Sequence, residues 1–188
     1  SSQVDLHAEY RGVVPELAAR AHLRQLRPIV QRALDDAGVG LDGIDGVAAT
    51  RGPGLIGALL VGFGFARALA LARGVPFMGV NHIEGHLLSP LLEDPEFTPP
   101  FAALIVSGGH TEFIHSRAWH EYRILGSTLD DAVGEAFDKV AVLLGLGYPG
   151  GPALERAARH GRADAHPFPR VWLRPRSLDV SLSGLKTA

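Results

Sequence analysis

Residues 44–80 read IDGVAATRGPGLIGALLVGFGFARALALARGVPFMGV, and this stretch decides the fold class. Ile44–Thr50 is short, apolar and bounded by glycine, as strands often are, and Val75–Val80 has the same features. Between them, Leu55–Arg73 has the length and composition of a helix, and Gly74 follows it as a stop signal. Two strands joined by a helix form a βαβ unit with parallel strands. The sequence therefore predicts an α/β protein.

The flanking segments extend this pattern on both sides. Apolar residues spaced by three and four predict a helix that begins near Pro15 and ends at Gly38, with a kink or a break at Pro28. The proline- and acid-rich connection at Pro90–Pro100 predicts a boundary between two lobes, residues 1–96 and 97–188. Beyond the boundary we expect strands at Phe101–Ser107, Thr111–His115 and Tyr122–Leu125, a helix at Asp130–Leu144, a loop at Gly147–Pro152 and a short helix at Ala153–His160.

Composition excludes several classes of protein. The chain has 188 residues, of which 46% are hydrophobic, and it has no cysteine, so a disulfide framework and a thiolate zinc site are excluded. No signal-peptide pattern opens the chain, which argues against secretion, and the absence of cysteine fits a reducing cytoplasm. The longest charge-free apolar run, Gly52–Ala66, has 15 residues, fewer than the ~18 to 20 that cross a bilayer. We therefore expect a buried loop and helix there, and no membrane partner.

Positive charge is concentrated near the C-terminus. The net charge of the chain is −2, but residues 151–188 carry six arginines and one lysine against three acidic residues, a net charge of +4. Such a segment could face the phosphates of a nucleic acid. A solvated arginine-rich surface explains the same composition, so charge alone leaves both interpretations open.

Two histidines four residues apart are candidate metal ligands. His82 and His86 lie on one face of a helix, where both imidazoles can reach a single ion. Paired histidines also occur on solvated helix faces, and a stable site needs a third ligand from elsewhere. Glu84 is two positions after His82, about 200° round the helix, whereas the zinc proteases need a glutamate directly after the first histidine. This spacing argues against metalloprotease chemistry.

Three further segments suggest contacts with a nucleotide. Ser107–Gly109 follows a predicted strand and leaves backbone N–H groups open to a phosphate, although two glycines are also common in hairpin turns. Asp131, Glu135 and Asp138 are spaced to form one stripe on a helix, where one of them could bind ribose hydroxyls or all three could form a solvated acidic face. The glycine-rich loop Gly147–Gly151 would let a base or sugar approach the backbone closely.

Eight blocks of sequence share one resemblance when they are read together. They are Ser2–Tyr10, Val13–Ala18, Gly52–Leu55, Asn81–His86, Ser107–Thr111, Asp130–Lys139, Gly147–Gly151 and Ser183–Thr187. In this order they resemble the bacterial TsaD family, the threonylcarbamoyltransferase component of tRNA modification, over nearly the whole chain. Arg11 departs from the family pattern, which usually has a glycine at that position.

The resemblance implies a fold and an activity. The fold would be an actin/Hsp70-like (ribonuclease H-like) two-lobe ATPase fold that is truncated at both ends. Residues 1–96 would be the first lobe without its opening strands, and residues 97–188 the start of the second lobe without its C-terminal part. The parent protein would transfer a threonylcarbamoyl group from threonylcarbamoyl-adenylate to N6 of the adenosine 3′ of the anticodon in tRNAs that read ANN codons. This chain alone is expected to be inactive.

The resemblance also implies site residues and partners. His82 and His86 would hold one iron(II) or zinc ion per subunit, together with an aspartate beyond this chain. The adenylate would contact Ile105, Val106, Ser107, Gly108, Gly109, Asp138 and Gly151. TsaB-like and TsaE-like proteins and tRNA would be the partners, and no nucleophilic side chain is required. The alternatives are another ATPase or kinase of the actin-like superfamily, a metalloprotease as in the older label glycoprotease, and a non-catalytic dimerisation relative.

Overall fold

The structure is a computed structural model that describes Tyr10 and residues 14–187. It divides into two compact units, Ser1–Leu88 and Ser89–Ala188, and the second begins with the short 3-10 helix η2 (Ser89–Leu92). Most of the family-like block Ser2–Tyr10 and the unusual Arg11 lie outside the described residues.

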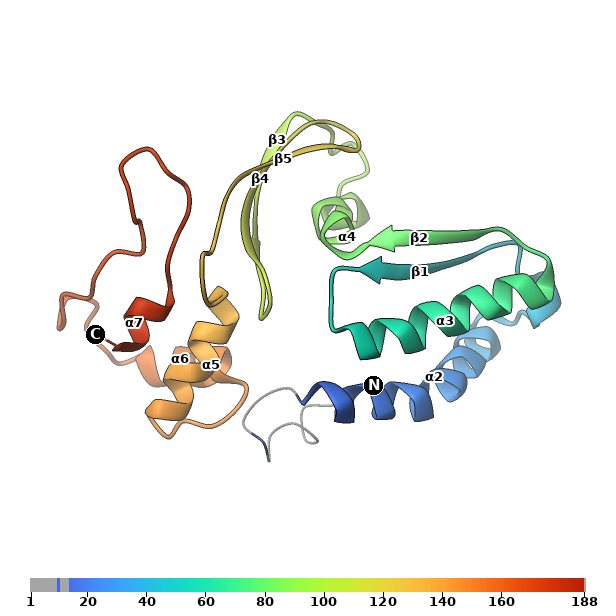
Figure 1. Cartoon of the computed structure of the whole chain (residues 1–188), viewed down its shortest axis with the longest axis horizontal. Helices are drawn as coiled ribbons and strands as arrows, with labels where there is room; N and C mark the ends of the chain where they lie inside the picture. Colours follow the sequence, from blue (N-terminus) through green and yellow to red (C-terminus); the bar gives the residue numbers. More distant parts are fainter. Residues whose placement is uncertain (1–9, 11–13, 188) are drawn as a thin grey trace. The chain divides into compact units, whose positions relative to one another are not determined.

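The first unit contains the predicted βαβ element. Its elements are α2 (Pro15–Ala37), η1 (Leu41–Gly43), β1 (Val47–Gly52), α3 (Ile56–Arg73), β2 (Phe77–Asn81) and α4 (His82–Leu88). β1 and β2 pair in parallel, from Val47 opposite Phe77 to Thr50 opposite Val80, which confirms the parallel arrangement. α3 contacts both strands and also α2 (Figure 1).

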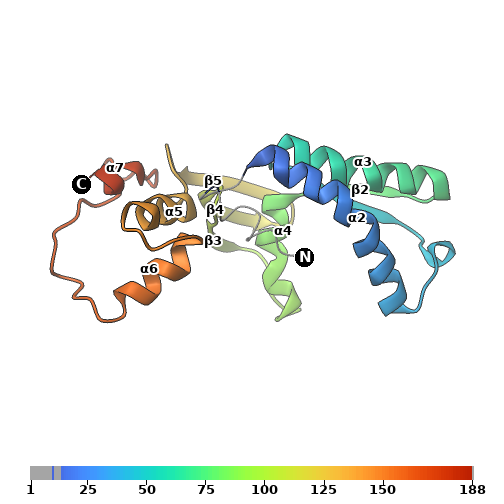
Figure 2. The same ribbon diagram turned by 90° about the horizontal axis from the view of Figure 1, so that it is seen from below.

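Proline and glycine set the ends and the bend of the helices. α2 begins at Pro15 and ends at Gly38, whose φ of 66° is the left-handed conformation that glycine adopts without strain. Pro28 lies inside the helix, which continues through it, and Figure 2 shows the axis of α2 changing direction along its length. The prediction of one kinked helix is thus confirmed, and the alternative of two separate helices is wrong. α3 ends in the same way at Gly74, with a φ of 67°.

α3 is much less buried than the sequence suggests. Only Ala66 and Ala70 are buried along it, while Ile56 and Leu71 are 71% and 83% exposed. The expectation of a buried helix is wrong because α3 is apolar on all sides, and two strands and one neighbouring helix cover only part of such a surface. Its 18 residues have a mean hydropathy of 1.6, enough by length and composition alone to cross a membrane, and core helices of soluble proteins share these properties.

The second unit combines a three-stranded sheet with three helices. Its elements are β3 (Phe101–Val106), β4 (Thr111–Ala118), β5 (Glu121–Ser127), α5 (Val133–Leu143), α6 (Gly150–Ala158) and α7 (Ser183–Thr187). The strands pair antiparallel in the order β3-β4-β5, which confirms the three predicted strands and makes the Ser107–Gly109 segment a hairpin turn. A small core forms around Ala136, Val180 and Leu182, against which Phe113 and other apolar residues pack.

α5 and α6 each begin at a different residue from the one predicted. α5 begins at Val133 instead of Asp130, because the hairpin satisfies its first N–H groups. Thr111 Oγ1 accepts a hydrogen bond from Val133 N at 2.9 Å, and Ser107 O accepts one from Gly134 N at 3.1 Å. α6 begins at Gly150, so the end of the predicted loop is in fact the first turn of a helix, where a proline is tolerated.

Candidate functional site

The two histidines lie on α4, and the residue before that helix fixes where it begins. Asn81 Oδ1 accepts hydrogen bonds from Ile83 N at 2.9 Å and from Glu84 N at 3.2 Å, which is the usual role of an asparagine before a helix. His82 is therefore the first residue of α4, and His86 follows one turn later. Both side chains belong to exposed residues, whereas Leu87 is buried.

The two imidazoles are close enough to share an ion. Their Nε2 atoms lie 3.3 Å apart, and their ring centroids are separated by 4.5 Å. A tetrahedral zinc ion with Zn–N distances of about 2.0 to 2.1 Å holds two nitrogens about 3.3 Å apart. The pair therefore fits two corners of a metal site. Within Tyr10 and residues 14–187 no group of three or more His, Cys, Asp or Glu side chains is placed to hold an ion, so the described residues provide two ligands only.

In the second unit, Ser107 organises the turn between β3 and β4. Its hydroxyl oxygen accepts hydrogen bonds from Gly109 N at 3.3 Å and from His110 N at 3.0 Å. Ser107 N donates to His110 O at 2.9 Å, so the N–H groups of Ser107 and Gly109, which looked open to a phosphate, are already engaged, and that of Gly108 has no partner in the described part of the chain. Ile105, at the end of β3, is buried, while Val106 is 51% exposed.

The start of α5 lies directly against this turn. A Cβ atom added to Gly134 would lie 2.8 Å from Gly108 Cα and 2.9 Å from Ser107 O, so only glycine permits the contact. Asp138 follows Gly134 by one turn on the same face of α5, because residues four apart on a helix lie above one another. Contacts made by Gly134 and Asp138 are therefore contacts of one helix face.

Asp138 holds the beginning of α6. Its Oδ1 accepts a hydrogen bond from Gly150 N at 2.7 Å, and Gly151 is the next residue of α6. Burial raises the pKa of the neighbouring Tyr148 hydroxyl, and the negative charge of Asp138 raises it further. The first helical turn of α5 thus contacts the Ser107–Gly109 hairpin, and its second helical turn contacts the start of α6. These predicted substrate positions, far apart in sequence, meet along one helix.

Gly151 also lines an apolar groove of about 840 Å³, together with Phe137 and Phe168. Neither Ser107–Gly109 nor Asp138 is among the residues that line this groove. This groove therefore does not bring all of the predicted substrate positions together. What connects the positions is the backbone of α5.

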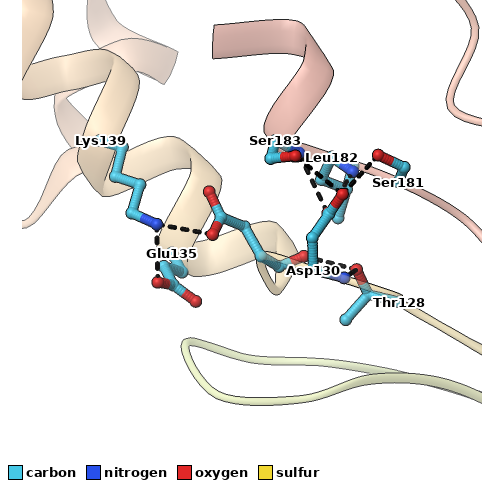
Figure 3. Close-up of polar contacts among 8 residues, drawn as sticks. Thr128, Asp130, Glu135, Lys139, Ser181, Leu182 and Ser183 are labelled. Carbon is cyan, nitrogen blue, oxygen red and sulfur yellow. Dashed lines mark hydrogen bonds and ion pairs between the residues drawn. The ribbon is translucent and has the colours of Figure 1, made fainter.

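The predicted stripe of three carboxylates is wrong. Asp131 precedes α5, so it does not continue the helical spacing of Glu135 and Asp138. Asp131 Oδ1 and Glu135 Oε1 both bind Lys139 Nζ, at 2.6 and 2.9 Å, and Figure 3 shows Lys139 reaching Glu135. The hydrogen bonds to Asp131 and Glu135 raise the pKa of Lys139. The remaining oxygen of Asp131, Oδ2, is buried without a hydrogen-bond partner among the described residues.

Asp130 forms a contact that sequence analysis did not find (Figure 3). Its carboxylate accepts hydrogen bonds from Leu182 N at 2.8 Å, from Ser183 N at 3.1 Å and from Ser183 Oγ at 2.8 Å, and also one from the hydroxyl of Ser181. Burial alone would raise the pKa of Asp130, but these hydrogen bonds lower it well below the usual range. The ionised carboxylate therefore fixes the N-terminus of α7.

Asp130→Asn is expected to release α7 from this contact. An amide cannot accept all of these hydrogen bonds, so exchange of the Leu182 and Ser183 amide protons should accelerate by roughly tenfold, a modest effect because Asp130 is exposed to solvent. Hydrogen–deuterium exchange measured by mass spectrometry over residues 181–187 tests this. Asp164→Asn, in an exposed loop, is the control and should leave that exchange unchanged.

The same contact has a predictable dependence on pH. Because the pKa of Asp130 is lowered in the folded state, its stabilisation is complete above the ordinary aspartate pKa of about 3.9. The stabilisation is lost as the pH falls through the lower, folded-state pKa. The protection of the amides of residues 181–187, which compares their exchange with the intrinsic rate at the same pH, should therefore fall in strong acid in the wild-type chain, and this acid response should be missing in Asp130→Asn. An identical response in both chains would contradict the assignment.

Comparison with known proteins identifies the family. The family described as TsaD: tRNA N6-adenosine threonylcarbamoyltransferase matches residues 1–188. Three relatives are named tRNA N6-adenosine threonylcarbamoyltransferase. Those from Trichlorobacter lovleyi, Desulforapulum autotrophicum and Bordetella petrii are 59%, 56% and 56% identical to this chain, over 100% of its length. The chain spans 55%, 56% and 54% of their lengths. The solved structure described as YeaZ from Pseudomonas aeruginosa is 27% identical to this chain, with a TM-score of 0.43. The match covers 56% of this chain and 49% of that structure's chain.

The family match agrees with the order of the sequence blocks and covers the chain from end to end. It includes the histidine pair on α4 and the segments on both sides of α5. The three relatives carry one name, at identities of 56% or more. The alternatives of another superfamily kinase and of a metalloprotease are thereby set aside as family assignments. This chain belongs to the TsaD family of tRNA N6-adenosine threonylcarbamoyltransferases.

Proposed function

We propose that the protein of full family length that contains this sequence transfers a threonylcarbamoyl group from threonylcarbamoyl-adenylate to N6 of the adenosine 3′ of the anticodon, in tRNAs that read ANN codons. The observation that carries the proposal is the family match over residues 1–188. The proposal includes an actin/Hsp70-like two-lobe ATPase fold, with residues 1–96 and 97–188 contributing to its two lobes. It also includes TsaB-like and TsaE-like partners and a cytoplasmic location.

His82 and His86 are the proposed ligands of one iron(II) or zinc ion. The 3.3 Å separation of their Nε2 atoms and their exposure support this assignment. A bound ion of this kind supplies Lewis acidity to a carbonyl group under attack. Asn81 caps the start of α4, and the helical spacing of this element places the two rings one turn apart. The third protein ligand is expected to be an aspartate that is not among the residues of this chain.

The proposed adenylate contacts are Ile105, Val106, Ser107, Gly108, Gly109, Asp138 and Gly151. The Gly108 N–H has no partner within the described residues and Gly108 is exposed, so it can donate a hydrogen bond to a ligand oxygen. Asp138 uses only Oδ1 to hold Gly150, which leaves Oδ2 for a ribose hydroxyl. The chain thus offers a donor beside the first turn of α5 and an acceptor on its second turn, along one face of the helix.

A chimeric enzyme tests the proposal. Residues 1–188 of this chain would replace the matching segment of the Trichlorobacter lovleyi relative, which is 59% identical over that segment. Incubated with threonylcarbamoyl-adenylate, iron(II) or zinc, the partner proteins and unmodified tRNA, the chimera should form the modified nucleoside, which digestion of the tRNA and mass spectrometry detect. The 188-residue chain alone should show no turnover, because catalytic zinc sites generally have three protein ligands and the described residues of this chain bring only two together.

Two outcomes of this experiment would contradict the proposed transfer or its need for a further metal ligand. A folded, metal-loaded chimera that forms no modified nucleoside would show that these 188 residues do not support the transfer. Turnover by the 188-residue chain alone would show instead that no further ligand is needed. The His82→Ala chimera serves as the inactive reference.

A further inference from the structure

We propose that Arg174 and Arg176 bind phosphate groups of RNA, and that the turn Arg174–Ser177 is the tRNA-contacting surface of the second unit. That the RNA is tRNA rests on the proposed function. The contact itself rests on how the chain holds these two arginines. The turn Arg174–Ser177 is called the arginine turn below.

The arginine turn belongs to a long segment that is anchored at one end. Residues 159–179, between α6 and α7, contain no helix or strand (Figure 1). Trp172 forms an isolated bridge with Val180 and packs against Phe113 at a centroid distance of 5.8 Å, and Ser181 N donates to Val171 O at 3.0 Å. Loops longer than about 12 to 15 residues without secondary structure are usually functional or disordered. The anchoring of this segment to the core favours function.

The backbone conformation of the arginine turn disfavours the arginine at position 176. Ser177 N donates to Arg174 O at 3.3 Å, Pro175 occupies the second position, and Arg176 has a φ of 67°. This is the pattern of a type II turn, which favours glycine or asparagine at its third position because φ is positive there. An arginine at that position costs backbone energy. The side chain of Arg176 therefore has a role that a glycine could not fill.

The two arginines share a polar hollow that suits an anion. The hollow has a volume of about 510 Å³ and is lined by Leu129, Arg174, Arg176 and Asp179, among others. The one carboxylate there, that of Asp179, is already engaged, since Oδ1 accepts from Ser127 N at 3.1 Å and Oδ2 from Ser177 Oγ at 3.0 Å. Neither arginine forms an ion pair with any described residue. Two guanidinium groups, which match phosphate oxygens in geometry, are thus presented together.

The surroundings favour RNA over other polyanions. Every residue from 155 to 170 is exposed, and four more arginines precede the turn: Arg156, Arg159, Arg162 and Arg170. Phe168 is 60% exposed in the same segment, and aromatic rings stack on the unpaired bases of an RNA loop. Leu129, which lines the hollow, is also four residues before α5, the helix that carries the proposed adenylate contacts. A transferase that acts on a tRNA base needs RNA close to its second substrate.

The test is RNA binding by the 188-residue chain. A fluorescently labelled tRNA anticodon stem-loop is titrated, at several salt concentrations, with the wild-type chain and with Arg174→Gln/Arg176→Gln. The double variant should bind about tenfold more weakly, and the slope of log K against log salt should fall by roughly 1 to 2. Arg24→Gln/Arg27→Gln removes the same charge from exposed positions on α2 and should change neither value.

A second variant separates charge from folding. Arg176→Gly relieves the positive φ, so the turn keeps its conformation while the charge is lost, and RNA binding should still weaken. Four results would overturn the inference: unchanged binding in the double variant, an equal loss in the α2 control, wild-type binding that prefers phosphatidylserine vesicles to the stem-loop, or no RNA binding at all. None of these decides the chimera experiment, which reports on transfer independently.

Discussion

Replacing Gly150 with alanine is expected to destabilise the second unit by roughly 3 kcal/mol, because no side chain fits at this position. An added Cβ would lie 2.5 Å from both Asp138 Cα and Phe137 O. These are backbone atoms of α5, so no rotation of a side chain can relieve the overlap. α6 would have to move away from α5, and the 2.7 Å hydrogen bond from Gly150 N to Asp138 would be lost.

The neighbouring glycine provides a matched control for this prediction. A Cβ on Gly151 has nothing within 4 Å, so Gly151→Ala should change the free energy of unfolding by only about 0.5 kcal/mol. Both tryptophans, Trp119 and Trp172, lie in the second unit, so their fluorescence during urea denaturation reports on its unfolding. Equal urea midpoints for Gly150→Ala and Gly151→Ala would show that α5 and α6 are not in the close contact described.

His82→Ala and His86→Ala are each expected to weaken zinc binding to the chain by at least about tenfold, because each leaves a single imidazole in place of a pair. The Nε2 atoms lie 3.3 Å apart, so one ion can contact both nitrogens in the wild-type chain. Competition with a chromogenic chelator measures the affinity for zinc directly. It requires neither tRNA nor the adenylate.

The control for this experiment must remove a histidine that is not part of the pair. His160 is exposed and follows α6 in the second unit, so His160→Ala should leave the zinc affinity unchanged. A chain in which both His82 and His86 are replaced, but which binds zinc as tightly as the wild type, would exclude the α4 pair as the site. Circular dichroism of each variant confirms that a lost affinity does not reflect lost helix.

Local pattern was sufficient to place most helices and strands. Gly38 and Gly74 mark the ends of α2 and α3, and Pro28 marks the bend in α2, because glycine and proline act on the backbone within one turn of their own position. The spacing of His82 and His86 predicted that the rings share a face for the same reason. Boundaries set by other segments were not predictable. α5 begins at Val133 because Thr111 and Ser107 satisfy its first N–H groups.

The sequence by itself determined the α/β class, the parallel βαβ unit, the histidine pair and the family, since each depends on residues close together or on the order of blocks along the chain. Only the tertiary structure decided what the carboxylates do. Asp130 fixes the start of α7, Asp131 binds Lys139, and Asp138 holds α6. In sequence these three acids look alike. Their roles differ because different segments of the folded chain, up to 53 residues away, bring N–H groups or a cation to each of them.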